Sequence, residues 1–278
     1  MMREIAIILT LTGLITSIAA EKKYLLGSVE NKAELVENAE FAPKSTRIQA
    51  IRQCGAWRYY FCMRPLINNL KDADIDIRVA SIRNLGVLRR QEAVAHLLPI
   101  IKDEGKSEQD EAAVKNETEE QKKARLEKEK KEKIEAQAAS LVALGYIKDA
   151  SVVPEIEKFL SNENEELRRT AAHSLGLLNK ESSADALKTQ LSSEKSTRVQ
   201  VELLKSLILI TGSTDYQAQL FSRLKDTDNW VRFFAADALL DLHLKSALQD
   251  LEEALQVEND EWVRERMFKA YRECLYLP

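Results

Sequence analysis

Residues 226–240 read DTDNWVRFFAADALL, and this stretch decides the fold because its pattern returns at a fixed interval. One apolar position recurs every 32 residues, and a second recurs eight residues after it. The first series is Leu167, Val199, Val231 and Val263, and the second is Leu175, Leu207, Leu239 and Tyr271. A period of roughly 20–50 residues is typical of arrays in which each repeat packs on its neighbours. The pattern therefore predicts a solenoid, an architecture that more often binds partners than performs chemistry.

Each repeat contains a second apolar pair beyond the first two series. Its members are spaced i, i+4, so both lie on one face of a helix. The pairs are Leu66/Leu70, Leu97/Ile101, Ile156/Leu160, Leu187/Leu191, Leu220/Leu224 and Leu251/Leu255. We therefore expect an all-α solenoid of antiparallel helix hairpins, each helix about 12 residues long. The array has about six complete units and ends in the first helix of a seventh.

A row of helix-capping residues supports this register. Three residues before the valine-type position stand Asp74, Asn164, Ser196, Asp228 and Asp260. Their side-chain oxygens accept hydrogen bonds from the free amides of a first helical turn. The first and third units break the row with Pro43 and Lys133. A glycine follows the repeat leucine in several units, as in Leu85-Gly86 and Leu175-Gly176, and predicts the start of the connection to the second helix.

The third unit is displaced by a charged insertion over residues 104–133. Gly86 and Gly145 are 59 residues apart where about 31 are expected, and the extra segment holds ten acidic and nine basic residues. Because Lys133 is not a cap, the charged helix is expected to run directly into the first helix of the third unit. We expect residues 104–116 to form a mobile loop. The segment is either a solvated, projecting helix or a docking arm for a charged partner.

The N-terminus resembles a targeting segment. Arg3 precedes an apolar run that ends at Ala20, Ser17-Ile18-Ala19 matches a cleavage site, and Glu21-Lys22-Lys23 follows. This pattern is typical of a cleaved secretory signal peptide over residues 1–20, and an uncleaved anchor or a chance apolar terminus remain as alternatives. Residues 21–42 form a linker or N-terminal cap, with a short helix expected at 28–41, and the array occupies 43–278. The protein is expected to be periplasmic or secreted, with no membrane span once the signal is removed.

The three cysteines, Cys54, Cys62 and Cys274, do not form a disulfide framework. Cys54 occupies a repeat-leucine position, which favours a small core residue, although a bridge to Cys62 is possible in an oxidising compartment. The residues Trp57, Tyr59, Tyr60 and Phe61 form an aromatic cluster nearby, which we expect to pack against the N-terminal cap.

The motif Asp74-Ile75-Asp76-Ile77-Arg78, followed by Leu85-Gly86, resembles the HEAT-like repeat in its short, phycobilisome-lyase-type version. Residues 226–239 are the best copy, and residues 164–176 and 260–271 are good copies. The resemblance covers residues 43–278 apart from the insertion, and it concerns the fold because the motif is structural. The recurring arginines are expected to bind aspartates and carbonyls at the turns between repeats. They are Arg78, Arg168, Arg232 and Arg264, with Gln137 in place of an arginine in the third unit.

The sequence contains no catalytic constellation. His96, His173 and His243 fall at different repeat positions, and no metal-binding spacing, phosphate-binding loop or nucleophile motif accompanies them. The formal net charge of −4 gives no case for nucleic-acid binding. No catalytic, cofactor-binding or metal-binding residue is therefore assigned, no cofactor is expected, and the protein is interpreted as not being an enzyme.

One set of side chains departs from the repeat pattern. The position before the valine is polar in three units, but it is Trp230 and Trp262 in the last two, and Phe233 and Phe234 follow Trp230 on the same stripe. Exposed aromatics are typical of binding hot spots. Trp230, Phe233, Phe234 and Trp262 are therefore the candidate partner-binding residues. The alternative is that both tryptophans lie flat on the preceding turn and one phenylalanine is core.

The last unit lacks its second helix, yet Val263, Met267, Tyr271 and Leu275 have core spacing. Either the sixth unit covers this face, or part of it stays open for a partner or a second copy; the oligomeric state is left undecided. The function expected is a non-enzymatic, exported scaffold that binds a protein partner of unknown identity. The resemblance implies an alternative, a bilin-lyase-like or chaperone-like protein that acts on another protein.

Overall fold

The computed structural model describes residues 29–103 and 117–276, and these residues form fourteen α-helices and no strand. The expected signal peptide at residues 1–20 and the expected loop at 104–116 lie outside the described residues. The first helices of the units are α3 (Lys44–Ala56), α5 (Ile75–Leu88), α7 (Glu119–Ile147), α9 (Glu165–Leu178), α11 (Thr197–Thr211), α13 (Asn229–Leu242) and α15 (Glu261–Leu275). The second helices are α4 (Met63–Asn68), α6 (Val94–Lys102), α8 (Val153–Glu157), α10 (Ala184–Ser193), α12 (Thr214–Ser222) and α14 (Leu248–Val257). Helix α2 (Val29–Phe41) precedes them, and the expected all-α solenoid with a final half-unit is confirmed.

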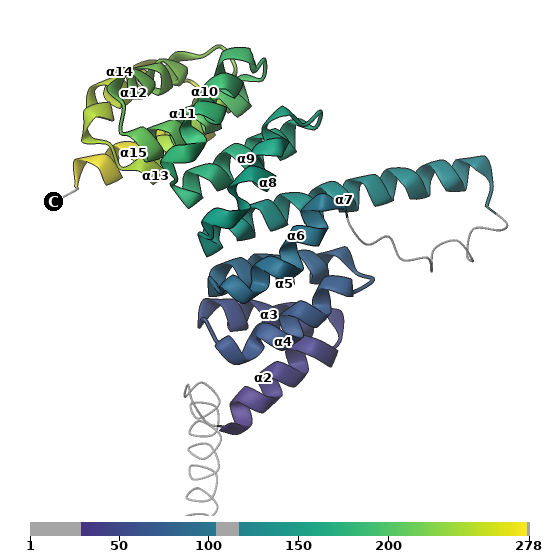
Figure 1. Cartoon of the computed structure of the whole chain (residues 1–278). Coiled ribbons are helices and arrows are strands. Elements are labelled where there is room, and N and C mark those ends of the chain that lie inside the picture. Colours follow the sequence, from purple (N-terminus) through teal and green to yellow (C-terminus); the bar gives the residue numbers. More distant parts are fainter. Residues whose placement is uncertain (1–28, 104–116, 277–278) are drawn as a thin grey trace, which may run out of the picture.

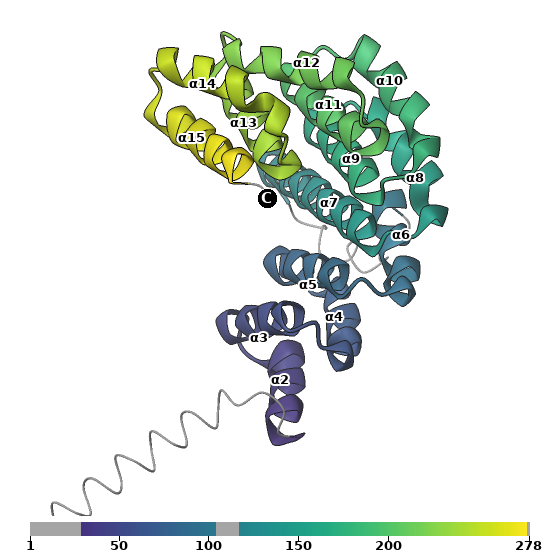
Figure 2. The same cartoon turned by 90° about the vertical axis from the view of Figure 1, so that its left-hand side faces the viewer.

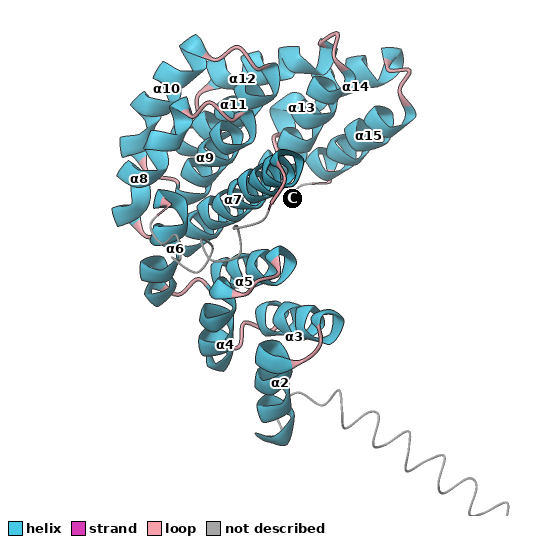
Figure 3. Cartoon of the chain, turned by 90° about the vertical axis from the view of Figure 1, so that its right-hand side faces the viewer, coloured by secondary structure: helices cyan, strands magenta, loops and turns pink. Residues whose placement is uncertain are grey.

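The units stack into an arc. The first helices lie side by side along its inner side, and the second helices form its outer side (Figures 2 and 3). Helix α7 is longer than its neighbours, and its N-terminal half projects from the array (Figure 1). The inner, concave side of the arc is therefore built from one face of each first helix.

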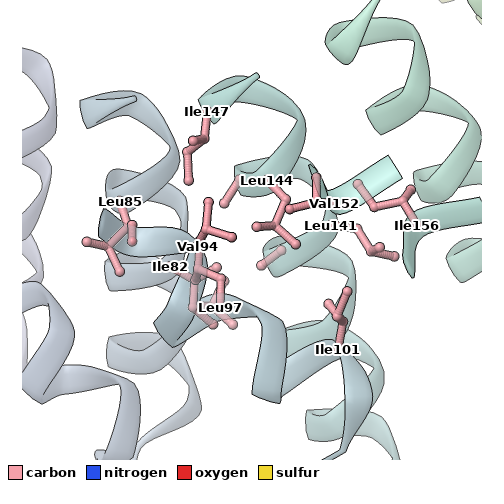
Figure 4. Packing of buried hydrophobic residues seen from close by; sticks show 14 of the residues in the cluster. Ile82, Leu85, Val94, Leu97, Ile101, Leu141, Leu144, Ile147, Val152 and Ile156 are labelled. Atoms are coloured by element: carbon pink, nitrogen blue, oxygen red, sulfur yellow. The ribbon is translucent and has the colours of Figure 1, made fainter. Parts of the chain in front are cut away.

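The core is continuous from unit to unit. Both apolar series of the first helices are buried except for Tyr271, which is half-buried, and the apolar pairs of the second helices pack against them. Figure 4 shows this packing where α5 and α6 meet α7 and α8, with Leu85, Leu97, Leu144 and Ile156 among the labelled side chains. Helix α11 joins the two halves of the core, because Val199 and Leu203 pack toward the N-terminal units and Val201 and Leu204 toward the C-terminal ones.

The second helices are shorter than the expected 12 residues. Their α-helical parts span five to ten residues, and 3-10 turns flank most of them. Helix α8 ends at Glu157 and continues as a 3-10 turn over Lys158–Ser161. The tighter turn redirects the chain toward the next first helix while Leu160 remains buried.

The repeat glycines lie inside the first helices, so the prediction that they begin the connection is wrong. Helix α5 continues past Gly86 to Leu88 and ends at Arg89, whose φ of 53° is left-handed. A Cβ built at Gly86 stands 2.6 Å from Cα of Ala143 in α7. Glycine is required here because two first helices approach each other closely.

Helix α7 runs unbroken from Glu119 to Ile147, so the charged segment does continue into the third unit. Its cap is Thr118, whose hydroxyl accepts from the Gln121 amide while the Gln121 side chain accepts from the Thr118 amide. This reciprocal capping box fixes the start of the helix far outside the core. Leu126, in the projecting half, is 50% exposed.

Three of the four recurring arginines, Arg78, Arg168 and Arg232, link one repeat to the next, with turn carbonyls as expected and with glutamates as their main carboxylate partners. Arg168 donates to the carbonyls of Asn162 and Glu163 behind it and, through two nitrogens, to Glu194 ahead of it. Arg232 does the same with the carbonyls at 226 and 227 and with Glu258. Gln137 and Gln200 replace arginine in two units, and each keeps a bond to a carbonyl of the preceding turn.

These arginine links lower the pKa of a bound carboxylate and remove one helix-capping hydrogen bond. Burial alone raises the pKa of Glu194, but hydrogen bonds from Arg168, the Ser196 amide and Gln190 outweigh it and lower that pKa to about 2. Asp74, Asn164, Ser196 and Asp228 cap their helices as expected. Asp260 does not, because its carboxylate instead accepts from Arg232 at 3.1 Å.

The N-terminal unit is closed by α2 and by a disulfide. Leu35 and Ala39 of α2 are buried against the first unit, which makes this helix the cap of the array. Cys54 is fully buried, as its leucine position predicts, but it is bonded to Cys62, so the interpretation as a free core residue is wrong. The chain folds back within eight residues and brings the two sulfurs together, a geometry that helix spacing alone does not reveal.

The aromatic cluster of this unit divides in two. The rings of Tyr59 and Phe61 stack at 4.7 Å between centroids and pack on the core, and Lys32 of α2 lies over Phe61. Trp57 and Tyr60 instead remain 42% and 57% exposed. Packing against the N-terminal cap therefore holds for only half of this cluster.

Candidate functional site: the concave face

The four candidate aromatics come together on the concave face, and we call Trp230, Phe233, Phe234 and Trp262 the concave aromatic cluster. Trp230, Phe233 and Phe234 occupy the side of α13 opposite its buried residues, and Trp262 lies on α15. The ring centroids of Trp230 and Trp262 are 4.7 Å apart, and those of Phe233 and Trp262 are 4.9 Å apart. Trp230 also stacks on Phe234 at 6.0 Å. Two adjacent repeats thus contribute to one aromatic surface.

The exposed fractions of these four side chains describe their packing, and partner binding at them stays a prediction. Trp230 is 47% exposed, and the other three rings are half-buried against the C-terminal core. Neither phenylalanine is a fully buried core residue, and Trp262 lies on Trp230 and Phe233 instead of on a turn. The cluster is therefore a compact surface patch whose rings hold one another in place.

Two arginines border the patch. The Arg198 guanidinium lies 5.8 Å from the Trp230 ring centroid, and that of Arg266 lies 4.9 Å from the Phe233 centroid. Such stacking orients each guanidinium over an aromatic face. Arg266 also pairs with Asp237 at 3.0 Å, so the patch has a charged, hydrogen-bonding rim.

A network of charged side chains continues the surface from α13 to α11 and α9. Glu202 of α11 lies 2.8 Å from Nδ1 of His173 and 3.7 Å from Nζ of Lys205. Lys205 reaches forward to Asp241 at 2.6 Å. A small hollow of about 60 Å³ opens between these helices, lined by side chains from all three that include Arg169, Glu202 and Phe234.

Two members of the network, Glu202 and Lys205, are held in their charged forms. Burial alone raises the pKa of Glu202, but the hydrogen bond with His173 and the charges of Lys205 and Arg169 outweigh burial and lower that pKa. For Lys205, burial lowers the pKa, and Glu202 and Asp241 outweigh burial and raise it. Sequence inspection missed this network because its partners lie on different repeats, with 29 residues between His173 and Glu202 and 36 between Lys205 and Asp241. The signal in the sequence is that His173 and Lys205 occupy the same repeat position, 32 residues apart.

The concave aromatic cluster and its two bordering arginines offer apolar and hydrogen-bonding contacts that are suited to binding. Across residues 29–103 and 117–276, no three His, Cys, Asp or Glu side chains gather in a way that could hold a metal ion. Within the same residues, no helix combines the length and the apolar character that crossing a bilayer requires.

Comparison with protein families identifies the architecture. A family model described as HEAT repeats matches residues 123–208 and 189–272, which together span more than half of the chain. The chain belongs to the HEAT-repeat family. A comparison with curated proteins finds no match.

Solved structures similar to this HEAT-repeat chain share its fold at low identity. A chain of the complex of CpcE and CpcF of phycocyanin lyase from Nostoc sp. PCC7120 aligns with a TM-score of 0.56 at 15% identity, over 86% of this chain and 93% of that one. Human deoxyhypusine hydroxylase aligns with a TM-score of 0.38 at 14% identity, over 89% and 97%. The first likeness shows a common fold, and the second is too weak to support an argument.

Proposed function

We propose that this HEAT-repeat protein is a non-enzymatic scaffold that binds a protein partner on its concave face. The observation that supports the proposal is the concave aromatic cluster, where two repeats place four rings on a face that is polar in the preceding units. Tryptophan and arginine are enriched where interfaces concentrate their binding energy. Here both residue types lie in one patch, and its rings are already ordered before a partner arrives.

The geometry favours an apolar anchor surrounded by polar contacts. A partner side chain that covers the exposed part of Trp230 removes apolar surface from water. Arg198 and Arg266 are held over the rings, so they can donate hydrogen bonds to the partner at the rim without a large loss of side-chain entropy. Little rearrangement of this face is needed for binding.

We propose as well that the protein is exported from the cytoplasm. It rests on the sequence pattern of residues 1–20, and the Cys54–Cys62 disulfide supports it because such bonds persist in oxidising compartments. N-terminal sequencing of the protein from fractionated native cells tests this part. A chain that retains residues 1–20 and occurs in the cytosol contradicts it.

The binding surface is tested by comparing the wild type with the double variant Trp230→Ala/Trp262→Ala. Each protein is produced in its native compartment, chemically crosslinked to the proteins bound to it, and purified so that these bound proteins can be identified. We expect the partner captured by the wild type to be lost. The matched control is Trp57→Ala, which removes an equally exposed tryptophan far from the concave face and retains the partner. Circular dichroism checks that each variant is folded, and a folded double variant that captures the partner as well as the wild type contradicts the proposal.

The alternative of a bilin-lyase-like or chaperone-like activity has no observation of this chain in its favour. The phycocyanin lyase complex is similar in fold alone, at 15% identity. The scaffold is therefore the function that we propose.

A further inference from the structure

The first two repeats concentrate positive charge that the rest of the chain does not share. Residues 44–102 hold eleven basic and four acidic side chains, whereas the whole chain holds 41 and 45. Three of those four carboxylates already form ion pairs with Lys44 or Arg47. Six exposed arginines of this stretch make no ion pair or side-chain hydrogen bond with any residue that the structure describes, namely Arg52, Arg58, Arg64, Arg83, Arg89 and Arg90. These two repeats are therefore the basic end of a weakly acidic chain.

Two of these arginines lie on the concave face, and we call them the concave arginine pair. Arg52 belongs to α3 and Arg83 to α5, one repeat apart. They occupy the repeat position that His173, Lys205 and Asp237 hold in later units. Packed helices are roughly 8–10 Å apart, so the two guanidinium groups belong to one stretch of the concave surface.

In the later units, the charge at this repeat position is paired with a residue of the following first helix. The partner comes from one of two positions, which lie seven residues apart in the repeat. The pairs are His173–Glu202 at 2.8 Å, Lys205–Asp241 at 2.6 Å and Asp237–Arg266 at 3.0 Å. Cross-repeat ion pairs thus satisfy this stripe of the concave face from α9 to α15.

The concave arginine pair lacks such partners because the corresponding positions carry no charge. They are Ala80 and Val87 for Arg52, and Ala139 and Tyr146 for Arg83. Val87 is 36% exposed, so the surface beside the arginines is open. A guanidinium has five N–H donors and no acceptor, and its planar fork matches a carboxylate in a two-point hydrogen bond. The first two repeats therefore present donors without the acceptors that later repeats supply.

We propose that the concave face of the first two repeats binds an acidic segment of a protein partner. Carboxylates of that segment take the place of the missing cross-repeat partners of Arg52 and Arg83. This site lies at the opposite end of the array from the concave aromatic cluster, so it does not rest on the proposed function.

The shape and extent of the site favour a short acidic peptide over other polyanions. A flat lipid surface does not reach the inner side of an arc (Figures 2 and 3). A long nucleic acid needs a continuous basic track, but the next residue of the stripe is the uncharged Val142. On the other side, α2 carries four glutamates and one lysine. The positive surface is therefore limited to two repeats.

Fluorescence anisotropy of the full chain with a fluorescein-labelled peptide of alternating glutamate and serine tests the proposal. We expect a dissociation constant below about 1 mM at about 0.15 M ionic strength. Arg52→Glu/Arg83→Glu is expected to raise it at least about tenfold, because two attractive contacts become repulsive. Arg58→Glu/Arg64→Glu is the matched control, since it changes the net charge equally at exposed positions off the concave stripe, and its effect stays below about twofold.

A second variant tests the missing-partner argument with both arginines in place. Val87→Asp gives Arg52 the kind of partner that Asp241 is to Lys205. It is expected to weaken peptide binding by about threefold or more, because the new carboxylate competes for the guanidinium. Val87→Asn has the same shape without the charge and is expected to bind as the wild type does. Circular dichroism checks that every variant is folded.

Four results overturn the proposal. The peptide does not bind below about 1 mM; the concave arginine variant binds no more weakly than its matched control; Val87→Asp binds as tightly as Val87→Asn; or an oligothymidylate of equal charge, or a vesicle of phosphatidylglycerol and phosphatidylcholine, binds more tightly than the peptide. The Trp230→Ala/Trp262→Ala variant is expected to bind the peptide as the wild type does, so failure of this site leaves the concave aromatic cluster to its own test.

Discussion

Replacing Gly86 with alanine tests the close helix approach on which the whole array depends. In an isolated helix, glycine to alanine is favourable by about 1 kcal/mol. In this fold the new Cβ stands 2.6 Å from Cα and 2.9 Å from Cβ of Ala143. Carbon atoms in contact prefer roughly 3.5–4.0 Å, so α5 and α7 have to separate by about 1 Å.

Overpacking of this kind costs about 1–3 kcal/mol and occasionally more. The upper end applies here because the nearest atom belongs to the backbone of α7, which has no rotamer to change. After subtracting the gain in helix propensity, Gly86→Ala is expected to destabilise the protein by about 2 kcal/mol. The corresponding fall in the melting temperature is roughly 4–8 °C for a chain of this size.

Urea denaturation followed by circular dichroism measures the change. Gly212→Ala is the control, because its added Cβ meets nothing within 4 Å and only the left-handed backbone at φ 65° opposes it, at a cost of about 1 kcal/mol. Ala143→Gly in the Gly86→Ala background is expected to recover little, since the contact with Cα remains. A Gly86→Ala variant that is more stable than the wild type by about 1 kcal/mol refutes the argument, because propensity alone then explains it.

Three further predictions concern the contacts between repeats and the disulfide. The lowered pKa of Glu194 contributes up to about 3 kcal/mol of stability, fully present above its ordinary value of 4.5 and lost as the pH falls toward about 2; urea unfolding between pH 7 and pH 3 is expected to show a smaller pH dependence in Glu194→Gln. Arg232→Ala leaves the almost fully buried carboxylate of Glu258 without its partner and is expected to cost about 3 kcal/mol. Arg264→Ala, at the same repeat position, is expected to change the unfolding free energy by less than about 0.5 kcal/mol. Replacing both Cys54 and Cys62 with serine removes the crosslink between two positions that are eight residues apart and so raises the conformational entropy of the unfolded chain. Thermal unfolding is expected to show an unfolding free energy lower by about 2.5 kcal/mol. A variant as stable as the wild type contradicts a disulfide in the native protein.

Local periodicity was sufficient to predict the architecture. The 32-residue interval, the caps and the recurring arginines specify helices, their order and the contacts at each turn, because all of these interactions join residues within one repeat or the next. Arg168 shows this in part, since its bonds to the carbonyls of the turn were expected, whereas its carboxylate partner is Glu194 and not an aspartate. The four candidate aromatics were found in the same way, as departures from the repeat pattern.

Other features depended on distances that periodicity does not contain. The pattern Leu-Gly was compatible with a turn, but only the packed helices show that Gly86 is required by the backbone of α7. Asp260 matched the cap position, yet Arg232 from the preceding repeat draws its carboxylate away. The Cys54–Cys62 bond likewise depends on how tightly the chain folds back after α3.

The sequence by itself determined that this chain is a HEAT-like solenoid, because a repeated apolar pattern can be buried only by stacking one unit on the next. The tertiary structure alone decided which side of each helix faces the concave surface, and therefore that Trp230 and Trp262 form one patch while Phe268 faces outward. The physical reason is that exposure depends on whether a neighbouring repeat covers a given position. At the last unit, no neighbour within the described chain does.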